Sequence, residues 1–339
     1  MQSAIPNPQS AIPHALAVGL FCATFVLLSA GALVTSEGAG MAFRDWPTSD
    51  GYNMFFYPWL KAAGDKFIEH GHRLMGILVG LITIAVTISV WSLDRRRWVG
   101  WLAIAALFLV IAQGLLGGLR VRADAVLLAR IHACTGPLFL ATTAALAVVT
   151  SRLWHRQSNS LPITGHSLRV NATALTAILF LQIVVGAHVR HVSPYAAAGM
   201  LKVAIMFHLL LALFVVLYVA ALLFRTASLR SGPLFRPALG LGLLVTCQVF
   251  LGMASWVVKY SWPAGVFANS PIVANWTNTA GSGLQSLIVT THVAVGSLML
   301  AVALQLSLRT WRLTVRPTVE HAAAQREIPL NHSRMGAVL

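Results

Sequence analysis

The feature that most constrains this chain is a series of eight long apolar stretches. The hydrocarbon core of a bilayer is about 30 Å thick, and about 20 residues of α-helix cross it. Backbone groups in lipid must be hydrogen-bonded within their own segment, so such stretches form helices. We therefore predict an all-α polytopic membrane protein with eight transmembrane helices. The stretches are residues 15–36, 69–91, 99–119, 127–150, 170–190, 200–224, 237–258 and 284–308.

The distribution of charge supports a membrane protein and argues against nucleic-acid binding. Only 10% of the residues are charged and 57% are apolar, whereas a soluble domain carries about 25% charged residues. The net charge of +15 comes largely from arginines that directly follow the second, fourth, sixth and eighth stretches. Cytoplasmic loops are enriched in this way. We predict an inner (plasma) membrane protein with both termini cytoplasmic and no nucleic-acid partner. The arginines are Arg95, Arg96, Arg97, Arg152, Arg156, Arg225, Arg230, Arg309, Arg312 and Arg316.

A weak internal repeat divides the chain into helix pairs. Each even-numbered stretch has a histidine near its outer end that is followed, four positions later, by a small residue: His72 and Gly76, His132 and Gly136, His208 and Ala212, His292 and Gly296. Three odd-numbered stretches echo each other with a glutamine four positions before a glycine: Gln113 and Gly117, Gln182 and Gly186, Gln248 and Gly252. Four such pairs predict two pseudo-symmetric four-helix bundles, at 15–160 and 165–312. Residues 1–14 would be a cytoplasmic segment and residues 313–339 a mobile cytoplasmic tail.

The four histidines suggest a heme protein. An ionisable side chain at membrane depth is a functional candidate, and four from four helices can form two facing pairs. A histidine pair is a common axial ligand set for heme iron. The small residue at i+4 lies on the same helix face, where it leaves room for a flat macrocycle. Cationic side chains near the outer helix ends can pair with propionates; these are Arg73, Arg120, Arg122, Arg130, Arg190 and Lys202.

Other interpretations of the histidines stay open. Small residues also permit close helix packing, and the histidines could then hydrogen-bond neighbouring helices. Zinc is a weaker alternative, since we expect no ligating cysteine beside the histidines and the H-E-x-x-H spacing is absent from the sequence.

Glu69 is the only acidic residue inside a predicted spanning stretch. It precedes His72 by three residues, so both lie on one helix face. A carboxylate beside a macrocycle can take up protons or hold a developing cation. The alternative is an ion pair with Arg73 or Lys66. His70 points away from His72 by helical geometry, so we expect it behind the residues that contact the ligand.

Several short strings then make the chain resemble a known family. They are Glu-x-x-His-Arg at Glu69 to Arg73, the single histidines His132, His208 and His292, GALVTSEGAG…DWP from Gly31 to Pro47, and GAHVRH from Gly186 to His191. In this order they resemble heme A synthase, the membrane enzyme family that converts heme O to heme A for cytochrome oxidase. The resemblance covers roughly residues 15–310.

The resemblance implies specific roles. His208 and His292 would hold a cofactor heme b, and His72 and His132 would flank the substrate heme O. Glu69 would be the catalytic carboxylate in oxidation of a ring methyl group to formyl through a hydroxymethyl stage. Many relatives carry a cysteine pair in the first outer loop and some carry another in the third, but this chain has no cysteine in either loop. A thiol relay there is therefore not expected.

Three alternatives to this enzyme remain. A diheme b-type electron carrier would use the same ligands without modifying heme, although it has little need for Glu69. A transporter is less favoured, because the polar residues gather at the outer end instead of the midplane. The prenyltransferase that makes heme O needs an N-D-x-x-D string, which the sequence lacks. That prenyltransferase, an electron acceptor and a second copy of the chain stay open as partners.

Overall fold

The computed structural model describes residues 11–156, 165–192, 198–229, 231–260 and 281–313. The predicted tail from residue 314 and most of the predicted N-terminal segment lie outside these residues. The long helices are α1 (Ala11–Ser36), α2 (Asp65–Leu93), α3 (Arg97–Ala123), α4 (Val126–Val149), α6 (Gly165–Arg190), α7 (Ala198–Ser228), α8 (Gly232–Tyr260) and α10 (Gly283–Leu313). A short helix, α5 (Arg152–Arg156), and two 3₁₀ turns, η2 (Ala39–Met41) and η3 (Trp59–Lys61), complete the elements described.

The predicted fold class is confirmed, because eight helices in the described part of the chain are long and apolar enough to cross a membrane. The protein is thus a multi-pass membrane protein. Most helices extend a few residues beyond the predicted stretches: α2 begins at Asp65 and α10 ends at Leu313. The apolar pattern marks only the segment in lipid, whereas the backbone hydrogen bonds continue past it. The turn of helix at α5 was not predicted.

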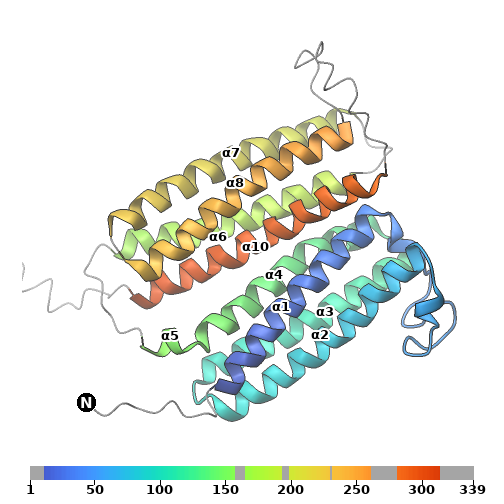
Figure 1. Cartoon of the computed structure of the whole chain (residues 1–339), viewed down its shortest axis with the longest axis horizontal. Helices are drawn as coiled ribbons and strands as arrows, with labels where there is room; N and C mark the ends of the chain where they lie inside the picture. The colour runs from blue at the N-terminus through green and yellow to red at the C-terminus, as the bar shows by residue number, and fades with distance from the viewer. Residues whose placement is uncertain (1–10, 157–164, 193–197, 230, 261–280, 314–339) are drawn as a thin grey trace, which may run out of the picture.

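The helices pack as two groups of four (Figure 1). In the first group, α1, α2, α3 and α4 each contact two others in a ring, and α6, α7, α8 and α10 do the same in the second. The groups meet where α4 packs against α10, with further contacts of α1 with α10 and of α4 with α6. This arrangement is consistent with the predicted pseudo-symmetric halves.

Each group has its own apolar core. Leu20, Val86 and Leu146 belong to the core of the first group, and Leu175 and Leu241 to that of the second. Lipid is as apolar as these side chains, so close van der Waals packing and hydrogen bonds hold the helices together. Hydroxyl groups inside the helices bond to carbonyls of the preceding turn; the Thr24 hydroxyl, for example, donates to the Leu20 carbonyl at 2.7 Å. Their polarity is thereby satisfied within one helix.

Residues 37–64 form the loop that joins α1 to α2 at one end of the molecule (Figure 1), and we call it the outer loop after its predicted orientation. We call this end, where α2 begins, the histidine end, and the opposite end, where α2 ends, the arginine end. Trp46 of the loop packs so tightly on Gly118 of α3 that any side chain at Gly118 would clash with its indole ring. The Trp59 indole N–H donates to the Phe67 carbonyl at 2.8 Å. The loop is thereby fastened to both α2 and α3.

Candidate functional site

Each of the four repeated histidines rests against a glycine of the helix before it. A Cβ atom built on that glycine would lie within 3.3 Å of the histidine Cε1 atom, tighter than nearly all real contacts of a Cβ atom. The imidazole therefore occupies the space that a side chain would need. The four contacts are Gly31 with His72 (2.8 Å), Gly117 with His132 (3.3 Å), Gly186 with His208 (3.2 Å) and Gly252 with His292 (3.2 Å).

The histidines form two pairs, one in each helix group. His72 and His132 lie within electrostatic range of each other, as do His208 and His292. All four side chains are half-buried. Their Nδ1 atoms are fully buried, and His72, His132 and His292 each interact with a backbone carbonyl of a neighbouring helix, that of Leu27, Gln113 and Gln248 respectively. The predicted pairing across each bundle is the pairing that the structure brings together.

The small residues at i+4 differ between the two groups. A Cβ atom at Gly76 would meet nothing within 4 Å, so the space below His72 is open. At Gly136 the nearest atom would be Gln113 Oε1, at 3.7 Å. At Gly296 the Gln248 amide nitrogen would lie 3.0 Å away. The expected room beside the ligand is thus present at Gly76, whereas a glutamine of the neighbouring helix occupies it at Gly296.

The glutamines contact the histidines in the second group. Gln182 Nε2 donates to the His208 carbonyl at 3.0 Å and lies 3.4 Å from His208 Nε2. Gln248 Nε2 lies 3.3 Å from His292 Nε2. In the first group, Gln113 instead donates to the Thr135 hydroxyl. The same residue type at equivalent positions thus faces a histidine nitrogen in one group and a hydroxyl in the other.

Glu69 is buried, with 3% of its surface exposed, and forms the predicted alternative ion pair with Arg73. Arg73 Nη2 donates to Glu69 Oε1 at 2.6 Å, and Arg73 Nε donates to the same oxygen at 3.2 Å. The second oxygen, Oε2, accepts the Phe43 backbone N–H at 3.2 Å. Glu69 therefore joins α2 to the outer loop.

Arg73 extends this connection deeper into the loop. Its Nη1 atom donates to the carbonyls of Asp45 at 3.0 Å and Thr48 at 2.9 Å. Its guanidinium also lies over the Phe43 ring, 5.0 Å from the centroid. His70 is buried, with 1% of its surface exposed. Its Nδ1 atom lies 3.1 Å from the Ser49 hydroxyl oxygen. As expected, His70 faces the loop and away from His72.

Arg120 connects the outer loop to the histidine pair of the first group. Arg120 Nη2 donates to the Gly40 carbonyl at 3.1 Å. The guanidinium lies within electrostatic range of Glu69, His72 and His132. Of the predicted propionate-binding arginines, Arg120 therefore lies within electrostatic range of the acid and of both histidines of this pair.

Arg190 lies at the contact between the two helix groups. Its Nη2 atom donates to the Ala32 carbonyl and the Ser36 hydroxyl of α1, both at 2.8 Å. Ser36 in turn lies 3.0 Å from the Thr290 hydroxyl of α10, two residues before His292. Arg190 also lies within electrostatic range of His292. This arginine is thus placed beside the second histidine pair, with Nη2 engaged by α1.

Reasoning from the sequence did not assign a role to the glycines that contact the histidines. The sequence shows Gly117, Gly186 and Gly252 as a repeated position, and Gly31 as the first residue of a motif, but it does not show which residue each of them contacts. The signal that could have found them is their placement near the loop before each histidine, since a helix hairpin then brings the glycine and the histidine to the same depth.

Comparisons with known proteins match part of the chain. Residues 59–202 match the family model COX15-CtaA, described as cytochrome oxidase assembly protein. This span includes Glu69, His72 and His132, and it ends before His208. It therefore covers the acid and the first histidine pair, but not the second pair.

Curated relatives agree with the family model. The heme A synthase of Shouchella clausii is 28% identical over 177 residues, which are 51% of this chain and 58% of that protein. The heme A synthase of Lysinibacillus sphaericus is 28% identical over 180 residues, 52% of this chain and 57% of that protein. That of Listeria monocytogenes is 29% identical over 175 residues, 51% of this chain and 56% of that protein. The match thus spans little more than half the length of each relative. Within this span the predicted resemblance is confirmed: the chain is similar in sequence to the heme A synthases.

Proposed function

We propose that this protein is a heme A synthase-type oxidoreductase, which oxidises a ring methyl group of heme O to formyl through a hydroxymethyl intermediate for cytochrome oxidase biogenesis. One observation carries the proposal: four successive helix hairpins place a histidine against a glycine at the same depth, as two pairs. The similarity to heme A synthases supports the choice of reaction.

The donor set suits heme in both groups. Imidazole pairs are axial ligands of heme iron, and the glycines keep each imidazole close to the neighbouring helix. His208 and His292 would hold a cofactor heme b, with Arg190 beside His292 to pair with a propionate. When bound, heme b supplies a redox-active iron that carries electrons. The glutamines Gln182 and Gln248 would then have to turn away from the imidazole nitrogens, which flexible amide side chains can do.

The first group would hold the substrate heme O between His72 and His132. The open space at Gly76 gives the macrocycle room, and Arg120 lies within electrostatic range of both histidines to pair with a propionate. Each of the two oxidation stages would remove two electrons, which an external electron acceptor takes up, and release two protons; in the first stage a water molecule would supply the oxygen atom of the hydroxymethyl group. Glu69 is the only carboxylate among the described residues of the spanning helices that is buried at this end, so it is the group to accept a proton.

Glu69 must be partly free to do so. Its Oε1 atom is occupied by Arg73, while Oε2 accepts a single backbone N–H from Phe43. A carboxylate oxygen has two lone pairs, so Oε2 retains one for a proton. Arg73 holds the carboxylate in place and also holds the loop closed over this end, which would exclude water from the reaction.

The orientation follows from the arginines. The arginine end would face the cytoplasm by the positive-inside rule, so that both termini are cytoplasmic and the histidine end lies on the outer side of the plasma membrane. The outer loop would then cover the substrate site from the outer side.

The test is heme extraction and chromatography from membranes of a host that makes heme O, with and without this chain. We expect heme A, or its hydroxymethyl precursor, to appear only with the chain. The matched control is the His72→Ala variant, which should insert but yield neither. Bound heme b in the purified protein with heme O unchanged would instead support an electron carrier that does not modify heme.

A further inference from the structure

A second polar site lies at the arginine end, far from the histidines. A cavity of about 280 Å³ opens between the start of α1, the turn from α2 to α3, and the end of α4. Leu93, Arg95, Arg96, Thr150 and His155 contribute to its lining. Its volume is near the lower end of the range for small-molecule sites, about 300–1,000 Å³. The cavity therefore suits a compact group and is too small for a heme macrocycle.

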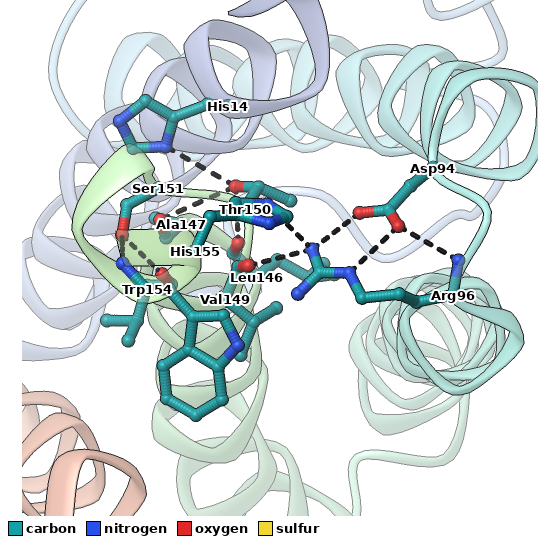
Figure 2. Close-up of polar contacts among 11 residues, drawn as sticks. His14, Asp94, Arg96, Leu146, Ala147, Val149, Thr150, Ser151, Trp154 and His155 are labelled. Carbon is teal, nitrogen blue, oxygen red and sulfur yellow. Dashed lines mark hydrogen bonds and ion pairs between the residues drawn. The ribbon is translucent and has the colours of Figure 1, made fainter. Parts of the chain in front are cut away.

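One wall is fixed by a hydrogen-bonded network around Arg96 (Figure 2). Arg96 Nε donates to Asp94 Oδ1 at 2.9 Å, and Arg96 Nη2 donates to Asp94 Oδ2 at 2.6 Å. The same Nη2 atom donates to the Val149 carbonyl at 2.9 Å and lies 3.3 Å from His155 Nε2. Although burial raises the pKa of Asp94, these bonds from Arg96 lower it below its usual value. The one acidic group in the wall is thus ionised and already neutralised.

The end of α4 and the start of α5 line the cavity through Thr150 and His155 (Figure 2). The Thr150 hydroxyl donates to the Leu146 carbonyl at 2.7 Å and lies 3.3 Å from His14 Nδ1 of α1. The Ser151 hydroxyl accepts the Trp154 backbone N–H at 3.2 Å and so begins the turn of α5. These contacts preform the cavity, because three helices are fixed to one another around it.

The cavity has an excess of positive charge. Arg95 is exposed and forms no hydrogen bond or ion pair with any residue that the structure describes. Arg96 Nη1 likewise has no hydrogen bond within the described ranges. Arg97 and Arg152 are exposed nearby in sequence. With Asp94 neutralised, the open donors of the cavity are cationic and suit an anion.

The surroundings of the cavity are those of a bilayer surface. Trp91 at the end of α2 is 53% exposed and Trp98 at the start of α3 is 48% exposed. Exposed tryptophans of this kind mark the level of lipid headgroups. Leu93, also exposed, adds an apolar part to the cavity lining. We therefore expect an anionic group that is attached to an apolar tail to bind here more tightly than a free anion.

We propose that this cavity binds the phosphate of an anionic phospholipid headgroup, with the Arg95 guanidinium as its principal partner and Arg96 Nη1 as the second donor. The acyl chains would extend along the exposed apolar surface of α2 beside Trp91. Basic sites between transmembrane helices on the cytoplasmic side bind anionic headgroups in this way, and guanidinium pairs with phosphate through two parallel hydrogen bonds.

The experiment is native mass spectrometry of the purified, delipidated full chain titrated with short-chain phosphatidylglycerol, with phosphatidylcholine and with inorganic phosphate. We expect one tightly bound phosphatidylglycerol and only weak binding of the other two probes. Arg95→Gln should weaken phosphatidylglycerol binding about fivefold or more. The variant should fold, because Arg95 is exposed and unpaired within the described part of the chain.

The matched control is Arg97→Gln. Arg97 lies two residues after Arg95 and does not line the cavity, so this variant removes the same charge outside the proposed site. Its affinity should stay within about twofold of the parent, because surface charges in water interact weakly. Equal weakening by both variants would overturn the site and leave only general surface charge. Phosphatidylcholine bound as tightly as phosphatidylglycerol would overturn the role of charge. Inorganic phosphate bound as tightly would overturn the lipid as the source of the anion.

Discussion

The two helix groups share one scaffold and differ in what surrounds it. In both, each histidine lies against a glycine of the preceding helix, and the two histidines form a pair. In the first group, the acid Glu69 stands three residues before His72, whereas Ile205 and Val289 stand at the matching positions of the second. The first group also has Leu27 at the position where the second has Gln182, whereas Gln113 of the first group matches Gln248 of the second.

This difference supports the proposed division of roles. In the second group, glutamine amides lie within 3.4 Å of the histidine Nε2 atoms, so the surroundings are polar, and the described residues there place no acid beside the histidines. In the first group, a buried ion pair, a closed loop and an open space at Gly76 lie around the histidines. A scaffold that only holds a cofactor needs none of these, whereas a site that admits a substrate and handles protons needs all three.

The largest expected effect is on bound heme, and loss of a histidine should have different consequences in the two histidine pairs. His208→Ala should remove bound heme b from the purified protein while the chain still inserts, because half of the axial ligand set is lost. His72→Ala should keep heme b and abolish heme A formation. Pyridine hemochromogen spectra and heme chromatography measure both. A full heme b content in the His208→Ala protein would contradict the assignment of this ligand.

The second prediction concerns Glu69. Glu69→Gln keeps an acceptor for the Phe43 N–H but removes the charge, so heme A formation should fall by about 10²–10⁴-fold at unchanged heme b content. The control is Glu37→Gln, an exposed acid at the same end, which should have no effect. An equal loss of activity in Arg73→Gln with the loop still closed would point to a structural role for the ion pair instead.

The third prediction compares glycines that contact a histidine with one that does not. Gly31→Ala places a Cβ atom 2.8 Å from His72 Cε1, and such overpacking costs about 1–3 kcal/mol. It should lower product formation and leave heme b in place. Gly252→Ala should instead reduce heme b retention. Gly76→Ala, which meets nothing within 4 Å, should leave folding and heme b content unchanged. Thermal unfolding monitored with heme absorbance distinguishes the three.

The fourth prediction tests the glutamines. Gln248 lies 3.3 Å from His292 Nε2 and would have to turn away for heme b to bind, so Gln248→Ala should raise the affinity for heme b by about tenfold, the equivalent of about 1.4 kcal/mol. Gln113 bonds to Thr135 instead, and Gln113→Ala should leave heme b affinity unaltered. Equal changes in both variants, measured by heme titration of the apoprotein, would remove this distinction between the groups.

The smallest effect is the response of the outer loop to acid. Burial raises the pKa of Asp45, but hydrogen bonds from the Gly51 N–H, the Thr48 side chain and the Asp50 N–H outweigh it and lower the pKa below 3.8. This carboxylate therefore stabilises the folded loop above about pH 3.8, and the contribution is lost as the pH falls through the lowered pKa. Hydrogen exchange of residues 49–52 should rise over that range, and Asp45→Asn should abolish the dependence.

Much of this organisation could be predicted because membranes restrict the possibilities. The eight helices follow from apolar length alone, and the four histidines stand out since ionisable residues are rare at membrane depth. The ion pair of Glu69 with Arg73 was one of two alternatives, and sequence spacing could not choose between them. The choice depends on where the loop carbonyls of Asp45 and Thr48 lie, because they supply the other partners of Arg73.

The sequence by itself determined that this chain crosses a membrane eight times and carries four matched histidines, because lipid requires helices and the repeat is visible in the spacing. Only the tertiary structure decided which glycines lie against the histidines, and that Glu69 and Arg73 close the loop 37–64. The physical reason is that these contacts join residues of different helices at distances of a few ångströms. The periodicity of apolar residues along one helix specifies which of its faces is apolar. It does not specify which helix packs against that face, or the depth and rotation of the helix within the bundle.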